Sequence, residues 1–182
     1  KRSEYYIDLT RDERSIMLGF SNNVKRNINK ARKKEFTFRE SDSSDNTERL
    51  IELLEETRKT RISKGYKDYN YFYFPNFTME SLHRLIDRGV IKFFLIETAG
   101  IIYGIHAVLA KKPMAYGMFI GFSSEGYLNH IPAFLESATL FSLKNSGYEY
   151  FNFGGVPTDE THLGISDFKR RLGAVRKHSS YG

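Results

Sequence analysis

The spacing of apolar residues along the chain alternates between two residues and three to four residues, a pattern typical of strands interleaved with helices. Alternating or continuously apolar segments predict strands at 4–9, 36–40, 90–97, 101–110, 114–122, 148–153 and 174–181. Apolar residues three or four apart predict helices at 21–35, 45–63, 77–89, 131–147 and 166–172. The segment 123–130 is expected to be a loop.

Turn and capping residues refine these boundaries. Ala99-Gly100 and Lys112-Pro113 separate three successive apolar segments, so an antiparallel meander is expected at 90–122. The unit 114–153 is expected to form a parallel strand pair around its helix. Helix N-caps are predicted at Ser21 or the Asn that follows it, and at Asp45 (in a capping box with Glu48), Thr78 and Ser166. Together the elements predict one mixed α/β or α+β domain over residues 1–182, with a mostly antiparallel sheet.

Composition indicates a globular, moderately basic protein. Hydrophobic residues make up 40% of the 182, and the longest apolar stretch, 90–110, is interrupted by charges, so no integral membrane segment is expected. The chain has no cysteine, which excludes disulfides and thiolate metal sites, and a cytoplasmic location is expected. The formal charge of +6 fits an anionic partner, and it fits a lysine-rich soluble surface equally well.

Several chemistries lack their motifs. The five histidines, at 83, 106, 130, 162 and 178, show no metal-ligand spacing, so no metal site is expected. The chain has no Gly-x-Ser-x-Gly elbow, no Walker loop and no dinucleotide-binding Gly-x-Gly-x-x-Gly. His106 lies in the middle of a predicted strand and is expected to be a core residue rather than a base.

Two segments are unusual in charge or aromatic content. Residues 25–34 carry six cations and no acid on a predicted helix, which is either a solvated face or a surface for phosphates or RNA. The segment 66–77 is rich in tyrosine and phenylalanine, and it either fills the core or stacks on a base or sugar. For both segments the residues alone favour the purely structural interpretation.

The stretch FNFGGVPTDETHLGISDFKRRLGA, residues 151–174, joins a strand, a glycine pair and a basic helix. The pair 154–155 permits positive φ and the close approach of another group, and it would serve equally in a plain turn. In the helix, Phe168 and Leu172 lie one turn apart and are expected to face inward. The cations at 169–171 point in different directions, so one of them can enter a site.

Four segments in this order resemble a known family: NVKRNINKARKK, LLEETRKTRISKG, FNFGG and GISDFKRRLGA. They resemble the Fem-type peptidyl transferases and the related acyltransferases of the GNAT superfamily, from about residue 5 to the end. The resemblance implies a GNAT-like fold whose central strands splay to admit an acyl donor. Fem-type enzymes carry two such domains, so this chain corresponds to one of them.

The resemblance also implies an activity. Fem-type enzymes transfer an amino acid from aminoacyl-tRNA to the amine of a nucleotide- or lipid-linked precursor, in peptidoglycan (cell-wall) biosynthesis. The expected co-substrate is therefore aminoacyl-tRNA, or acyl-CoA as in other GNAT enzymes, with no tightly bound cofactor. The expected partners are anionic: tRNA, CoA or a nucleotide-linked precursor.

Candidate site residues follow partly from this resemblance, which assigns Phe168, Lys169 and the cofactor loop, and partly from the glycine pair and the basic helix themselves. Lys169 is expected to be catalytic, with Phe168 beside it near the reacting ester. Further substrate contacts are expected at Gly154, Gly155, Asn152, Tyr116, Lys25, Arg26 and Lys30. The cofactor loop of GNAT enzymes corresponds to SSEGYLNHIPA, which lacks its glycine pattern. A co-substrate phosphate is expected there, at the helix N-terminus, near Gly126, Tyr127, Asn129 and His130.

The donor, the base and the reaction itself stay open at this level. Acyl transfer to an amine needs a positioned ester or thioester and a cation for the developing oxyanion, a role that suits Lys169. Glu97, Glu125 and Asp159 are equal candidates for a general base. The alternatives are an acyl-CoA-dependent N-acetyltransferase and a non-catalytic GNAT-like module that binds RNA or a phosphorylated ligand.

Overall fold

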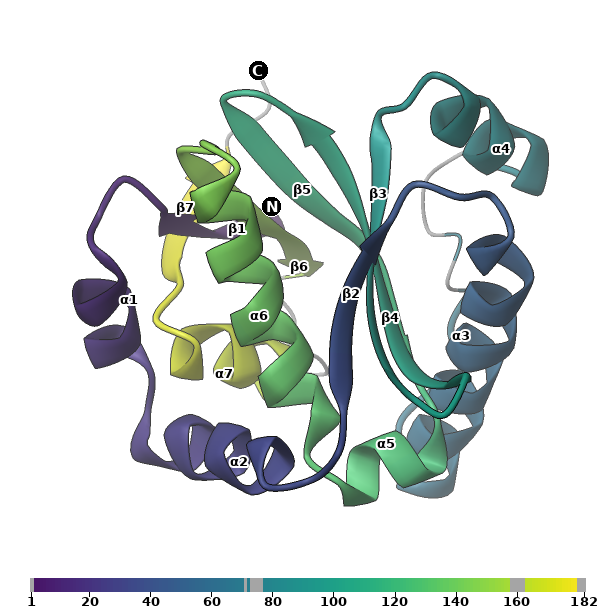
Figure 1. Ribbon diagram of the computed structural model, residues 1–182, viewed down its shortest axis with the longest axis horizontal. Helices are drawn as coiled ribbons and strands as arrows, with labels where there is room; N and C mark the ends of the chain where they lie inside the picture. Colours follow the sequence, from purple (N-terminus) through teal and green to yellow (C-terminus); the bar gives the residue numbers. More distant parts are fainter. Residues whose placement is uncertain (1, 71, 73–76, 158–162, 180–182) are drawn as a thin grey trace.

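A seven-stranded sheet with helices on both faces forms the protein (Figure 1). The computed structural model describes residues 2–70, 72, 77–157 and 163–179. The strands are β1 (Arg2–Asp8), β2 (Thr37–Ser41), β3 (Ile91–Thr98), β4 (Ile101–Lys111), β5 (Met114–Phe122), β6 (Tyr150–Pro157) and β7 (Val175–Ser179). The helices are α1 (Glu13–Gly19), α2 (Asn22–Arg32), α3 (Asn46–Ser63), α4 (Met79–Asp87), α5 (Ser124–Leu128), α6 (Ile131–Asn145) and α7 (Leu163–Arg171).

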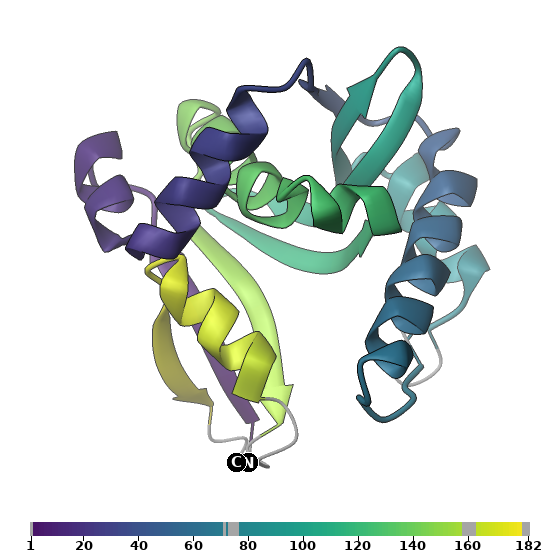
Figure 2. The same cartoon turned by 90° about the horizontal axis from the view of Figure 1, so that it is seen from below.

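The strand order β2-β3-β4-β5-β6-β1-β7 contains one parallel pair, β5 with β6, and the other neighbours are antiparallel. The predicted meander and the parallel unit around α6 are confirmed. The parallel pairing joins only 114–116 to 150–152, and Figure 2 shows the two strands starting side by side and then running apart. We call the place where they separate, just after Tyr116 and Asn152, the strand fork.

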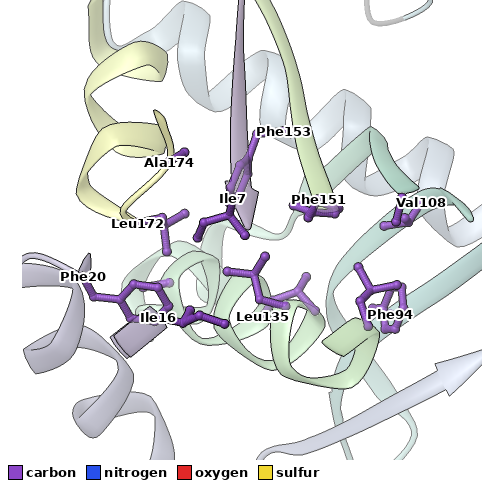
Figure 3. Packing of buried hydrophobic residues seen from close by; sticks show 14 of the residues in the cluster. Ile7, Ile16, Phe20, Phe94, Val108, Leu135, Phe151, Phe153, Leu172 and Ala174 are labelled. Atoms are coloured by element: carbon purple, nitrogen blue, oxygen red, sulfur yellow. The ribbon is translucent and has the colours of Figure 1, made fainter. Parts of the chain in front are cut away.

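Two hydrophobic cores lie on the two faces of the sheet. Helices α1, α2, α6 and α7 contribute to the first core, which includes Phe20, Phe94, Leu135, Phe151 and Leu172 (Figure 3). Helices α3 and α4 cover the other face, where Leu50, Leu53, Leu82, Phe93 and Ile105 are fully buried. Burying each such side chain contributes about 1.5–3 kcal/mol, so both layers hold the central strands in place. Within the described residues, every helix is too short or too polar to cross a membrane.

Two short helices were not predicted. No periodic pattern indicated α1, and α5 lies in the segment expected to be a loop. Both begin with a side-chain cap: Asp12 accepts from the amide of Ser15, and Ser123 accepts from the amide of Gly126. With seven and five residues, these helices are too short for a periodic apolar stripe to be recognised.

Several local boundaries differ from the prediction. Ser21 and Thr78 cap their helices as expected, each accepting from the amide three residues later. Asp45 already has helical φ and ψ of −59° and −22° and makes no capping hydrogen bond, so the predicted capping box is wrong. Ser166 lies inside α7 rather than at its start. The glycine pair 154–155 lies inside β6, so it is not a turn.

Candidate functional site

The strand fork brings together residues of β1, β5, β6 and α7. Beyond Asn152, β6 no longer pairs with β5, and side chains bind the backbone of Gly154 instead. The Gly154 N–H donates to Asn152 Oδ1 at 2.8 Å, and its carbonyl accepts from Lys169 Nζ at 2.9 Å. Lys169 therefore occupies the place of a strand neighbour at the point where the sheet opens.

Gly154 needs to be glycine for two reasons. Its φ is +80°, in the region that side chains disfavour, and a Cβ there would lie 3.2 Å from Tyr116 Oη. The prediction of positive φ and a close approach is therefore confirmed at this position. Gly155, by contrast, pairs with Glu4 in the antiparallel ladder, at the edge of the register shift between Glu4 and Tyr6. The glycine pair thus has one residue that shapes the fork and one that continues the strand.

Among the three consecutive cations of α7, only Lys169 is buried. Its side chain is 9% exposed, and Nζ lies 5.7 Å from the ring centroid of Tyr5. Arg170 and Arg171 are exposed and form ion pairs with Asp167 at 3.8 and 2.6 Å. Successive helix residues are rotated by about 100°, which explains why neighbours of equal charge face such different surroundings. Phe168 is partly buried and packs against the first core.

Glu4 is a carboxylate at the fork that no sequence pattern marked. Its Oε2 accepts from Asn152 Nδ2 at 3.0 Å and from Tyr6 Oη at 2.5 Å. Glu4, Asn152, Gly154 and Lys169 therefore form one hydrogen-bonded series across the fork. Since 148 residues separate Glu4 from Asn152, only the pairing of β1 with β6 brings them together.

The carboxylates considered from the sequence lie elsewhere. Glu97 is in β3 and forms an ion pair with Arg39 of β2 at 3.1 Å. Glu125 is exposed on α5, and Asp159 lies outside the described residues. Neither described candidate belongs to the series at the fork, so neither is supported as a general base there.

His106 is buried, as expected, but it contacts a buried acid. Its Nδ1 lies 3.3 Å from Glu136 Oε2 of α6, and the two side chains are 4% and 6% exposed. Among the described residues neither atom makes a hydrogen bond of good geometry, so the two buried polar groups lie close together without a hydrogen bond. Gly117 gives the imidazole its space, because a Cβ there would lie 2.7 Å from Nε2. The pair therefore lies directly behind the first residue of β5 beyond the fork.

A second group of predicted residues lies where α2 meets the start of α6. Lys34 donates a hydrogen bond to Asn129, and His130 caps α6 with φ of +61°. Burial, and then the charges of Lys30, Lys34 and Arg26, lower the pKa of His130. None of the six cations at 25–34 forms an ion pair with a described carboxylate. This corner of the molecule is therefore strongly positive.

The remaining predicted residues do not join this group. Gly126 is packed so tightly that a Cβ would lie 2.5 Å from the carbonyl oxygen of Tyr103. Tyr127 packs on Phe122, with ring centroids 5.3 Å apart. Lys25 lies beside Glu13 and Arg14 of α1. The structure therefore divides the predicted co-substrate residues, and only Asn129 and His130 face the cations of α2.

We expect Lys30→Gln to raise the pKa of His130, because one of the three charges that disfavour its protonation is removed. NMR titration of the imidazole checks this result. The pKa of His130 in the folded protein lies below its ordinary value of 6.5. The contribution of neutral His130 to the free energy of unfolding is therefore fully present above pH 6.5, and it is lost as the pH falls through the folded-state pKa. Lys33→Gln, on the same helix, is the control, and an equal shift in both variants would contradict a local effect.

The family follows from the whole chain rather than from one motif. A family model described as an acetyltransferase (GNAT) domain matches residues 19–170. The chain belongs to this family. The predicted GNAT-like fold, with a mostly antiparallel sheet flanked by helices, is therefore confirmed. GNAT enzymes transfer acyl groups from acyl-CoA or a similar co-substrate, and the described residues contain no cluster of three or more metal-ligating side chains.

Solved structures share the fold at low sequence identity. A structure of FemX matches with a TM-score of 0.75 and 14% identity over 96% of this chain and 59% of its own. L-PGS from Bacillus licheniformis matches with a TM-score of 0.64 and 15% identity, over 96% and 57%. An aminoglycoside acetyltransferase from an uncultured soil metagenomic sample matches with a TM-score of 0.50 and 18% identity, over 75% and 86%.

These identities show a shared GNAT fold and nothing finer. The chain spans less than two thirds of FemX and of L-PGS, so it corresponds to one part of those proteins. No curated protein sequence matches it.

Proposed function

We propose that the chain transfers an aminoacyl group from aminoacyl-tRNA to an amine acceptor at the strand fork. The observation that carries this proposal is the buried ammonium of Lys169, held on the carbonyl of Gly154 where β5 and β6 separate. A cation fixed in a site of low exposure stabilises the oxyanion that forms when an amine attacks an ester. Lys169 is therefore the proposed catalytic residue.

The chemistry balances with the groups at the fork. The amine nitrogen forms a bond to the ester carbonyl carbon, the carbonyl oxygen becomes an oxyanion beside Lys169, and the carbon–oxygen bond to the tRNA ribose then breaks. The amine loses a proton and the leaving ribose oxygen gains one. The acceptor ammonium first gives one proton to Glu4, which is held by Asn152 and Tyr6 and releases that proton to solvent, and the nitrogen of the adduct then gives its second proton to the leaving ribose oxygen.

The structure of residues 123–131 favours an aminoacyl ester over acyl-CoA as donor. Helix α5 occupies the place of the glycine-rich cofactor loop, and Gly126 is used for packing on Tyr103. The positive surface of α2, with Lys25, Arg26 and Lys30, supplies contacts for the phosphates of a tRNA. The resemblance of the sequence to Fem-type enzymes, which use a nucleotide- or lipid-linked precursor, makes such a cell-wall precursor the proposed acceptor.

One observation favours a second function. The cations at 25–34 have no described acidic partner, which also suits a non-catalytic module that binds RNA. The two functions differ in turnover. The test is to incubate the chain with a panel of amine acceptors and either radiolabelled aminoacyl-tRNA or radiolabelled acetyl-CoA. We expect labelled product from aminoacyl-tRNA and much less product from acetyl-CoA. Binding of tRNA without transfer would favour the second function, and efficient transfer from acetyl-CoA would refute the proposed donor.

A further inference from the structure

Arg61, near the end of α3, has an unusual environment for a partly buried arginine. Its guanidinium lies over two tyrosine rings, 4.9 Å from the centroid of Tyr66 and 5.3 Å from that of Tyr69. Its Nε is buried and makes no hydrogen bond. Within the described part of the chain, no carboxylate lies at ion-pair distance from it.

A neighbouring arginine shows what is missing. Arg58, one turn earlier on α3, donates to both carboxylate oxygens of Asp68 at 2.6 and 2.5 Å and to Glu55 at 2.9 Å. These contacts raise the pKa of Arg58 and lower that of Asp68. Partly buried charges are normally paired in this way, because removing a charge from water costs free energy. Among the described residues, no carboxylate offsets that cost for Arg61.

The surroundings of Arg61 add further donors. Lys64 lies with Nζ 5.3 Å from the ring centroid of Tyr127, which packs at the same end of α3. Burial raises the pKa of both Tyr69 and Tyr127, so their phenols stay protonated and able to donate. A side-chain hydrogen bond with Thr57 partly offsets this rise for Tyr127, and the charge of Arg61 offsets it further for both hydroxyls. Two cations and two neutral phenols thus converge, and the acids nearest to them, Glu55 and Asp68, are paired with Arg58.

This cluster faces the helix that carries Lys169. The hydroxyl of Tyr66 lies 3.4 Å from the position that a Cβ would take on Gly164, in the first turn of α7. Lys169 follows Gly164 by five positions on α7, or about 7.5 Å along the axis at the usual rise per residue. The cluster therefore lies within the reach of one substrate molecule from the fork.

We propose that Arg61, Lys64, Tyr69 and Tyr127 form a binding site for a phosphate-type oxyanion. Two positive charges match a phosphate better than a singly charged carboxylate, and a guanidinium edge with phenolic donors suits its several acceptor oxygens. We take this anion to be a part of the acyl donor or acceptor that is remote from the reacting bond, and this identification rests on the proposed function. The binding of an anion at this site does not depend on the proposed function.

NMR of the complete chain labelled with ¹⁵N tests the site, with inorganic pyrophosphate as the probe. Because Nε of Arg61 is buried, we expect its N–H to exchange slowly with water and its resonance to report directly on anion binding. The variant Arg61→Lys lacks this resonance and therefore assigns it. We expect that resonance to shift saturably, while Nε–H of Arg58, already bonded to Asp68, changes little. Lys64→Gln should weaken binding at least threefold.

The control is Lys59→Gln, which removes the same charge from an exposed position of α3 and should leave binding unchanged. Any of three results would overturn the proposal. The Arg61 shift fails to saturate with pyrophosphate, Lys59→Gln weakens pyrophosphate binding as much as Lys64→Gln does, or acetate binds with the same affinity as pyrophosphate. This experiment measures binding and not turnover. If the chain bound pyrophosphate but transferred no acyl group, the proposed function would be refuted and the proposed anion site would stand.

Discussion

Replacing Lys169 with methionine is expected to reduce acyl transfer by about 10²–10³-fold, the usual effect of removing one oxyanion-stabilising donor. Methionine keeps much of the side-chain length, so the packing beside Tyr5 is largely preserved. The carbonyl of Gly154 loses a hydrogen bond, which should lower the free energy of unfolding by about 1–3 kcal/mol. Initial rates with saturating donor and acceptor, together with urea unfolding, separate the two effects.

Arg170→Met is the matched control, because it removes the same charge from the next residue of α7. Arg170 is exposed and its pair with Asp167 is long, at 3.8 Å, so transfer should stay within about twofold of the original rate. Transfer by Lys169→Met at the original rate, in a folded protein, would refute the catalytic role. If Lys169 were purely structural, its replacement would lower the stability in proportion to any loss of transfer rate.

Replacing His106 with leucine is expected to destabilise the protein by about 1–3 kcal/mol, because it leaves the buried carboxyl group of Glu136 without the imidazole beside it. Both side chains are almost completely buried between β4 and α6, so water cannot compensate. Denaturant unfolding measures the change in midpoint, and the slope shows whether the unfolding remains a single transition.

The double variant His106→Leu with Glu136→Leu provides the control. Removing both members of a buried pair is often close to neutral, so the double variant should be more stable than His106→Leu alone. If the two substitutions were simply additive, the contact at 3.3 Å would contribute nothing and the prediction would be wrong.

Much of the architecture could be predicted from the sequence because local chemistry determines it. The meander 90–122 is marked by apolar segments and the turns between them, and the caps at Ser21 and Thr78 involve residues only three apart. Short helices escaped this reasoning, as α5 shows, because five residues contain too little periodicity. The start of α7 was misplaced because Ser166 is equally compatible with the inside of a helix.

The candidate site shows the opposite balance. The sequence by itself determined that Lys169 belongs to a cationic run beside a glycine pair, and that Gly154 can adopt positive φ. Only the tertiary structure decided which cation is buried, because that depends on the face of α7 that packs against β6. It alone brought Glu4 to Asn152, and it left Arg61 between two tyrosines with no acidic partner in the part of the chain that the structure describes. Contacts between distant segments depend on strand order and packing, which local residue patterns do not encode.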